Sequence, residues 1–248
     1  MSMINPLESV EIARRTMTLF FVVDTSSSMA GTKIGAVNTA IREVLPELNS
    51  ISDDNADAGI QMACLAFSND SSWRIKPSPV ASVSWYDLSA GGMTAMGEAF
   101  KELNSKLSRS QYLNSPTGCY APVIFLMSDG CPTDDYKSGL KELQENKWFK
   151  YAIRVAVAIG DDADKDVLTE FTGNPELVLT AHTPEALKAM IRFVSVTSSK
   201  IGSQSSGIGI GQNPNSNGGV QAKQQQMAQQ VQDFTATNSD LDALTDGF

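Results

Sequence analysis

The sequence predicts an α/β protein built on a mainly parallel sheet. Apolar runs rich in β-branched and aromatic residues recur along the chain, the clearest at 19–23, 122–127 and 153–159. Such unbroken runs are typical of strands that are buried on both faces. Stretches with apolar residues at helical spacing separate the runs, and strands that alternate with helices form βα units in parallel sheets.

The first part of the chain predicts two strands around one helix. The run 19–23 is the first strand and ends abruptly at Asp24. Apolar residues at helical spacing predict a helix over 33–48, near whose end Pro46 kinks or terminates it. A polar linker follows over 49–57, and the next apolar run predicts the second strand over 60–67.

The middle of the chain predicts an irregular edge and a second helix. Two short segments flanked by proline, 73–75 and 80–83, indicate an edge hairpin or an irregular connection. Two glycines then lead into Thr94, and the apolar spacing from Met96 to Leu107 predicts a helix that begins directly after it.

The alternation of strands and helices continues to about residue 196. The strand over 122–127 is followed by residues 132–135, which we expect to cap the next helix. The remaining elements are predicted as helices over 136–144, 165–171 and 184–196 and strands over 153–159 and 177–179.

The composition argues against several functional classes. The net charge is −9, and no basic stripe offers a nucleic-acid surface. No apolar run approaches the ~20 residues that span a bilayer, and the first 16 residues lack the apolar centre of a signal peptide. Cys64, Cys119 and Cys131 have no metal-ligand spacing, so we expect reduced thiols. We therefore expect a cytoplasmic protein that binds neither nucleic acid nor membrane.

Oxygen-bearing side chains gather in loops that we place at one edge of the predicted sheet. Asp24, Ser26 and Ser28 alternate in the loop after the first strand, Thr94 precedes a helix, and Asp129 follows the strand over 122–127. Ligands of open α/β sheets bind beyond the carboxyl ends of the strands. Five oxygen groups, two of them anionic, can neutralise a divalent cation and leave one coordination position open. We predict Mg²⁺, with Mn²⁺ or Ca²⁺ as alternatives.

Three separated motifs resemble the metal-ion-dependent adhesion site of von Willebrand factor type A domains. They are D-T-S-S-S-M, G-G-M-T-A-M-G-E-A and F-L-M-S-D-G. The resemblance covers about residues 10–197 and implies a Rossmann-like sheet, mostly parallel with one antiparallel edge strand, flanked by helices. It also implies three direct metal ligands, Ser26, Ser28 and Thr94, with Asp24 and Asp129 binding mostly through water. A partner's Asp or Glu completes the metal shell in that family. Ser27 departs from the commonest pattern, where glycine is frequent, and we expect the loop to accommodate it.

Two loops also resemble bacterial TerY-type proteins, which are associated with tellurite resistance and stress. The loops are S-D-G-C-P-T-D-D-Y and A-I-G-D-D-A-D-K-D-V-L. Proteins of this type often occur alongside a protein kinase and a phosphatase, which implies an adaptor or scaffold in a bacterial stress-response or signalling system. We interpret four aspartates of these loops as helix caps and turn residues: Asp134, Asp135, Asp161 and Asp162.

The composition changes at Ser198, from which we predict a flexible low-complexity linker and acidic tail over 198–248. Within it, 220–234 places apolar residues on one helical face and either stays disordered or folds on a partner. The tail tip carries Asp240, Asp242 and Asp246, which can occupy the open metal position or recruit a second protein. Candidate partner contacts are Trp85, Tyr86, Met93, Leu241, Leu244 and Phe248.

We therefore favour a cation-dependent protein-interaction module over an enzyme. The alternative is a Mg²⁺-dependent phosphohydrolase on a related sheet, which needs a second aspartate two residues after its nucleophile. That position is Ser26 here, and neither a P-loop nor a nucleophile-elbow motif is present. A third hypothesis is a scaffold whose site holds no metal, so that Mg²⁺ or Mn²⁺ leaves its thermal stability unchanged.

Overall fold

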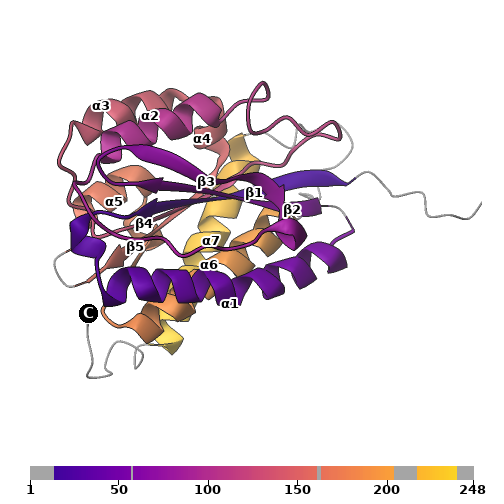
Figure 1. The fold of residues 1–248 in the computed structure, drawn as a ribbon. Helices are drawn as coiled ribbons and strands as arrows, with labels where there is room; N and C mark the ends of the chain where they lie inside the picture. Colours follow the sequence, from indigo (N-terminus) through magenta and orange to yellow (C-terminus); the bar gives the residue numbers. More distant parts are fainter. Residues whose placement is uncertain (1–13, 57, 161–162, 204–216, 239–248) are drawn as a thin grey trace, which may run out of the picture.

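The computed structural model describes residues 14–56, 58–160, 163–203 and 217–238, and it shows one six-stranded sheet between two layers of helices (Figure 1). The strand order is β3-β2-β1-β4-β5-β6. All neighbouring strands pair in parallel except β2 and β3, which are antiparallel. The strands are β1 Arg15–Asp24, β2 Ala58–Phe67, β3 Ser71–Pro79, β4 Val123–Ser128, β5 Ile153–Ile159 and β6 Val178–Ala181. The predicted fold class is confirmed, including the single antiparallel edge strand.

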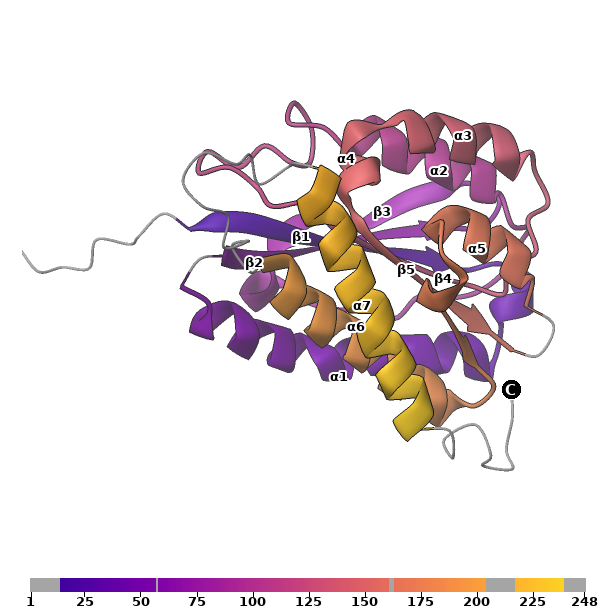
Figure 2. The same cartoon turned by 180° about the vertical axis from the view of Figure 1, so that it is seen from behind.

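Helices cover both faces of the sheet, with α1, α6 and α7 on one face and α2 to α5 on the other (Figures 1 and 2). The α-helices are α1 Thr32–Asp54, α2 Met96–Lys106, α3 Tyr136–Glu145, α4 Lys147–Tyr151, α5 Lys165–Thr172, α6 Pro184–Ser203 and α7 Asn217–Thr237. Short 3-10 turns occur at Ser27–Met29, Val80–Ser82 and Pro175–Leu177. None of the helices in the described ranges is long and apolar enough to cross a bilayer.

The two helical layers explain why β1 is apolar at every position of its centre. Successive side chains of a strand point to opposite faces. Phe20 and Val22 accordingly pack with the helices α2, α3 and α5, whereas Phe21 and Val23 pack with α1 and α6. All four side chains are buried. The burial of both faces removes the polar alternation of a half-exposed strand.

The helix α1 is longer than its sequence predicts. Pro46 lies inside the helix, which continues to Asp54, so the linker expected over 49–57 is helical for most of its length. Proline removes one backbone hydrogen bond of a helix but leaves the packing of its apolar face intact. Leu48, two residues after the proline, is fully buried and Ile51 packs against the same core. Packing of this face therefore outweighs the lost bond.

The edge of the sheet also differs from its prediction. The two short segments expected around 73–75 and 80–83 are one strand, β3, followed by a 3-10 turn. Its pairing with β2 shifts register twice, between Met62 and Cys64 and between Cys64 and Leu65. The short helix α4 was not predicted.

The chain after residue 197 is more ordered than predicted. The helix α6 runs on to Ser203, past the residue at which the linker was expected to begin. The helix α7 then packs against α6, with Met227 and Val231 buried and Phe234 stacked on Phe193 at 4.2 Å. This segment therefore folds on its own domain, which neither alternative for it anticipated. The expected tail contacts and aspartates of 239–248 lie outside the described residues.

Candidate metal centre

The centre of the site is the carboxylate of Asp24, which is held at the end of β1 by two neighbouring segments. The backbone N–H of Ser26 donates to Asp24 Oδ1 at 2.8 Å, and the hydroxyl of Ser128 donates to Asp24 Oδ2 at 2.6 Å. The hydroxyl oxygens of Ser26 and Ser28 lie 3.0 Å apart in the same loop. The structure thus brings the end of β4 against the first loop and fixes the orientation of the carboxylate.

Backbone hydrogen bonds join the first loop to the loop that carries Thr94. The N–H of Ser27 donates to the carbonyl of Gly92 at 3.0 Å, and the N–H of Gly91 donates to the carbonyl of Thr25 at 2.8 Å. Both bonds join backbone groups, so this contact between the two loops does not depend on the identity of their side chains. These bonds bring the first loop next to the loop of Thr94, which is about 70 positions away in the sequence.

Thr94 is held in place by residues 133 and 134, which the sequence analysis did not assign to the site. The N–H of Thr94 donates to Thr133 Oγ1 at 3.0 Å, and the N–H of Thr133 donates back to the carbonyl of Thr94 at 2.9 Å. The carboxylate of Asp134 accepts from the N–H groups of Gly97 and Glu98, at 3.0 and 3.1 Å, and so caps the first turn of α2. The prediction that Asp134 is a cap is correct, but the helix that it caps is distant in sequence.

The neighbouring aspartate caps the nearer helix. Asp135 accepts from the N–H of Ser138 at 3.2 Å, at the start of α3. The motif T-D-D before a helix predicts a cap for α3 but does not indicate that Asp134 caps α2. Only the packing of α2 against α3 could have revealed that role of Asp134. This packing is close, because a Cβ on Gly139 would lie 2.3 Å from the carbonyl oxygen of Gly97.

Asp129 supplies the second carboxylate of the site. Its Oδ2 is buried and has no hydrogen-bond partner among the described residues. Its backbone carbonyl accepts from the N–H of Asp164 at 2.8 Å, which anchors the loop to the start of α5. Gly130 follows with a φ of +72°, and a Cβ there would lie 2.5 Å from the carbonyl oxygen of Asp164. The loop after β4 therefore requires glycine at this position.

These residues fit a hard divalent cation. The orphaned Asp129 oxygen is costly unless it binds a cation or a water, and hydroxyl and carboxylate oxygens are the ligands that Mg²⁺ and Ca²⁺ prefer. Burial raises the pKa of the Asp24 carboxyl, the nearby Asp129 charge adds to this, and hydrogen bonds from Ser26 and Ser128 oppose it. A cation between the carboxylates would give the Asp129 oxygen a partner and would stabilise the charged form of Asp24. In the described ranges no three His, Cys, Asp or Glu side chains cluster, and the oxygen groups beside Asp24 are the hydroxyls of Ser26 and Ser128.

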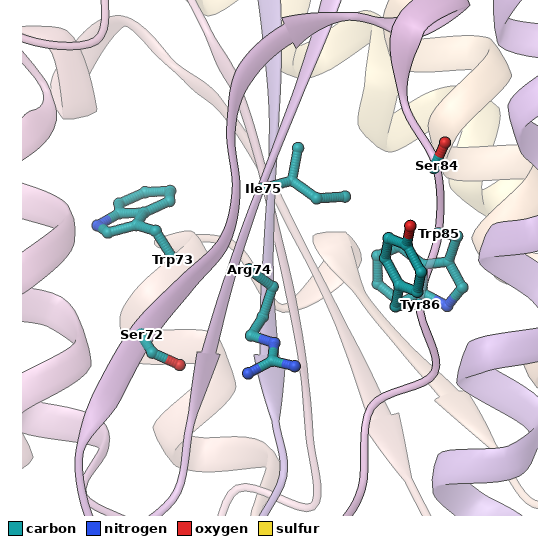
Figure 3. A pocket seen from close by; sticks show the side chains of 7 residues that line it. All are labelled: Ser72, Trp73, Arg74, Ile75, Ser84, Trp85 and Tyr86. Carbon is teal, nitrogen blue, oxygen red and sulfur yellow. The ribbon is translucent and has the colours of Figure 1, made fainter.

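The expected partner contacts lie at two places. Met93 is 58% exposed beside Thr94, at the rim of the site. Tyr86 is 79% exposed and Trp85 is half-buried, and both line a groove beside β3 (Figure 3). The indole N–H of Trp85 donates to Asn38 Oδ1 at 3.2 Å. Asp161 and Asp162, expected as turn residues, lie outside the described residues.

All three cysteines lie in the described ranges and none forms a disulfide; Cys64 is buried, Cys119 half-buried and Cys131 exposed. Burial raises the pKa of the Cys64 thiol to about 12.

Solved structures with the same fold include a pilus adhesin, a mussel byssus protein and a pilus tip protein. The pilus adhesin SpaC from Lactobacillus rhamnosus GG superposes with a TM-score of 0.57 at 14% identity, over 76% of this chain and 30% of that one. Proximal thread matrix protein 1 from the mussel byssus, with a zinc-occupied MIDAS motif, gives a TM-score of 0.57 at 14% identity over 74% and 49%. The vWF domain of the type V pili tip protein Mfa5 from Porphyromonas gingivalis superposes with a TM-score of 0.58 at 12% identity, over 79% of this chain and 99% of that one. This chain thus spans less than half the length of the first two.

Identities this low establish the fold alone. No curated protein matches the sequence of this chain. The model of the von Willebrand factor type A domain matches residues 18–193, which include all five predicted metal-site residues and every strand of the sheet except the first three residues of β1. The chain belongs to the von Willebrand factor type A domain family.

Proposed function

We propose that this protein is a protein-interaction module whose docking depends on a divalent cation. The observation that carries the proposal is the buried Oδ2 of Asp129, which has no hydrogen-bond partner among the described residues and whose carboxylate interacts with that of Asp24. The loop of Asp24 also carries a pair of hydroxyls 3.0 Å apart. Ser26, Ser28 and Thr94 are the proposed direct ligands, and Asp24 and Asp129 bind mostly through water. The proposed cation is Mg²⁺, with Mn²⁺ or Ca²⁺ as alternatives.

The charge balance of the site explains why a partner's carboxylate binds there. The proposed direct ligands are neutral hydroxyls, and the two carboxylates act mostly through water. The cation therefore keeps a strong attraction for an anionic side chain at its open position. The chain's own contribution is orientation, because Asp24 is held by hydrogen bonds at both oxygens and Thr94 by the loop that carries Thr133. A pre-positioned site loses less conformational entropy when the partner binds.

The proposed partner is a protein that presents Asp or Glu. The resemblance of the loops after β4 and β5 to TerY-type proteins supports a kinase or phosphatase of a bacterial stress-response or signalling system as the partner, and a cytoplasmic location. The zinc-occupied site of the mussel protein supports a divalent metal without deciding which. A phosphohydrolase is disfavoured, because Ser26 occupies the position where such an enzyme needs a second aspartate.

The test is capture of partners by the immobilised full chain with Mg²⁺ or with chelator. Ser26→Ala removes a proposed ligand, whereas Ser27→Ala is the matched control, because the exposed Ser27 contributes only its backbone N–H to the loop contact. We expect a partner that chelator and Ser26→Ala both release and Ser27→Ala retains. Partners that bind equally in chelator, or equally to both variants, would contradict the proposal.

A further inference from the structure

A groove that none of the predicted metal ligands lines runs along the open edge of the sheet. It lies between β3 and the extended segment 83–89 (Figure 3). Two cavities of about 260 and 240 Å³ form it, and both are lined by Ser72 and Arg74. The second cavity extends to Thr25, in the loop that carries the first metal-site residues. The groove therefore ends beside the metal centre.

The inner wall of the groove is a strand with one unpaired side. Among the described residues β3 pairs only with β2, and no backbone hydrogen bond joins it to the segment 83–89. An exposed strand edge is a template for another extended chain. Pro77 and Pro79 lack a backbone N–H and block such pairing at one end of β3, so the available edge is 71–76.

A bulge directs Arg74 into this groove. Leu65 pairs with Trp73 and its neighbour Cys64 pairs with Ile75, which leaves Arg74 as the extra residue of β3. Such bulges turn a side chain out of the regular pattern. Figure 3 shows the result, with Trp73 and Ile75 pointing in opposite directions and the Arg74 guanidinium between β3 and the segment of Trp85.

The guanidinium of Arg74 has no ion-pair partner in the part of the chain that the structure describes. Two carboxylates line one of the two cavities, but Asp87 pairs with Arg42 instead, and Asp70 forms no ion pair with a described residue. Lys76, two residues further along the edge, is exposed and likewise has no ion-pair partner among the described residues. The other cavity, between Arg74 and Trp85, has no carboxylate in its lining, so an anionic occupant there can pair with Arg74.

The outer wall of the groove is held rigidly by one buried side chain. Asn38 of α1 donates to the carbonyl of Leu88 at 2.9 Å and accepts from the N–H of Leu88 at 2.8 Å and from the indole of Trp85 at 3.2 Å. Leu88 is buried in the core. The wall is thus formed before anything binds, which reduces the entropy that binding costs.

We propose that this groove binds an extended acidic segment of a protein partner, with Arg74 pairing one of its carboxylates. The segment adds to the edge of β3 over 71–76, and Trp85 and Tyr86 contact its apolar side chains. The proposal deepens the proposed function, because the groove ends beside the metal centre and the same partner can supply both carboxylates. The contact with Arg74 does not itself require the metal.

The test uses a fluorescein-labelled ten-residue peptide in which aspartate alternates with valine, because valine favours the extended conformation. Binding to the full chain is measured by fluorescence polarisation in the presence of chelator, so that the metal centre does not contribute. The matched peptide carries asparagine in place of every aspartate. The variants are Arg74→Glu, Ser26→Ala and Lys141→Glu, the last of which makes the same charge change at an exposed residue of α3.

We expect saturable binding of the aspartate peptide, weakened about tenfold or more by Arg74→Glu and by asparagine in the peptide. Ser26→Ala and Lys141→Glu should leave it unchanged. Equal binding of the two peptides, equal binding to Arg74→Glu and wild type, or no binding would overturn the groove proposal and leave the metal proposal intact. Binding that appears only with metal and is lost in Ser26→Ala would place the peptide at the metal centre and also overturn the groove.

Discussion

Replacing Asp134 by alanine should weaken metal binding from a distance. The Asp134 carboxylate caps α2 by accepting from the N–H groups of Gly97 and Glu98 at 3.0 and 3.1 Å. Loss of a cap costs about 0.5–2 kcal/mol, and loss of a negative charge near a helix N-terminus adds about 0.3–1 kcal/mol. We expect Asp134→Ala to lower the free energy of unfolding by about 1–3 kcal/mol, or Tm by roughly 2–12 °C. The same change loosens the start of α2, directly after Thr94.

The control for this prediction is its neighbour in the sequence. Asp135→Ala removes a cap from α3, where the carboxylate accepts from Ser138 N–H at 3.2 Å, and should cost about 1 kcal/mol. α3 carries none of the predicted ligands. Unfolding in urea gives the stability of each variant, and calorimetric titration gives the affinity of the full chain for Mn²⁺. We expect several-fold weaker Mn²⁺ binding in Asp134→Ala alone. Equal affinities in the two variants would refute the positioning of Thr94 by residues 133 and 134.

Three further predictions test the electrostatics, the C-terminal helix and the thiols. Burial raises the folded-state pKa of Asp24 above its usual 3.8, so its stabilising contribution is present below that pH and is lost as the pH rises through the folded-state value. Without metal, unfolding in urea across a pH series should show wild type losing stability relative to Asp24→Asn above pH 3.8, and parallel pH profiles would contradict this. Phe234→Ala removes the ring stacked on Phe193 and should lower the free energy of unfolding by about 1–2 kcal/mol. Amide hydrogen exchange should become faster in α7 while the sheet stays protected. Unchanged exchange in α7 would count against its docking on α6. In native protein at pH 8 a thiol reagent should modify Cys131 and spare Cys64, which is buried with a pKa of about 12. Equal rates of modification at the two thiols would contradict this and show that the sheet opens readily.

The sequence was sufficient to predict the strands β1, β2, β4, β5 and β6 and the loops that follow β1 and β4, but not the single edge strand β3. Buried strands have a strong local signal, because each face of β1, β4 and β5 must be apolar under the helices. The site loops follow from the same signal, since Asp24 and Asp129 mark where apolar runs stop. The hydrogen bond from Ser128 to Asp24 is a consequence of this arrangement, because it joins the ends of the neighbouring strands β1 and β4.

The features that were missed depend on contacts between distant segments. Pro46 carries a strong local signal to end a helix, but packing of Leu48 keeps α1 intact beyond it. The glutamine-rich helix α7 has too few apolar residues to predict its docking, which depends on the surface of α6 and the ring of Phe193. The cap of α2 by Asp134 joins residues 37 positions apart and has no local signature.

The most direct test of the proposed metal centre is an anomalous diffraction map of crystals of the full chain soaked in Mn²⁺. We expect one peak bound by the hydroxyl oxygens of Ser26, Ser28 and Thr94, with Asp24 and Asp129 joined to the ion mostly through water. A peak bound elsewhere, a peak that Thr94 does not contact, or no peak at millimolar Mn²⁺ would contradict it.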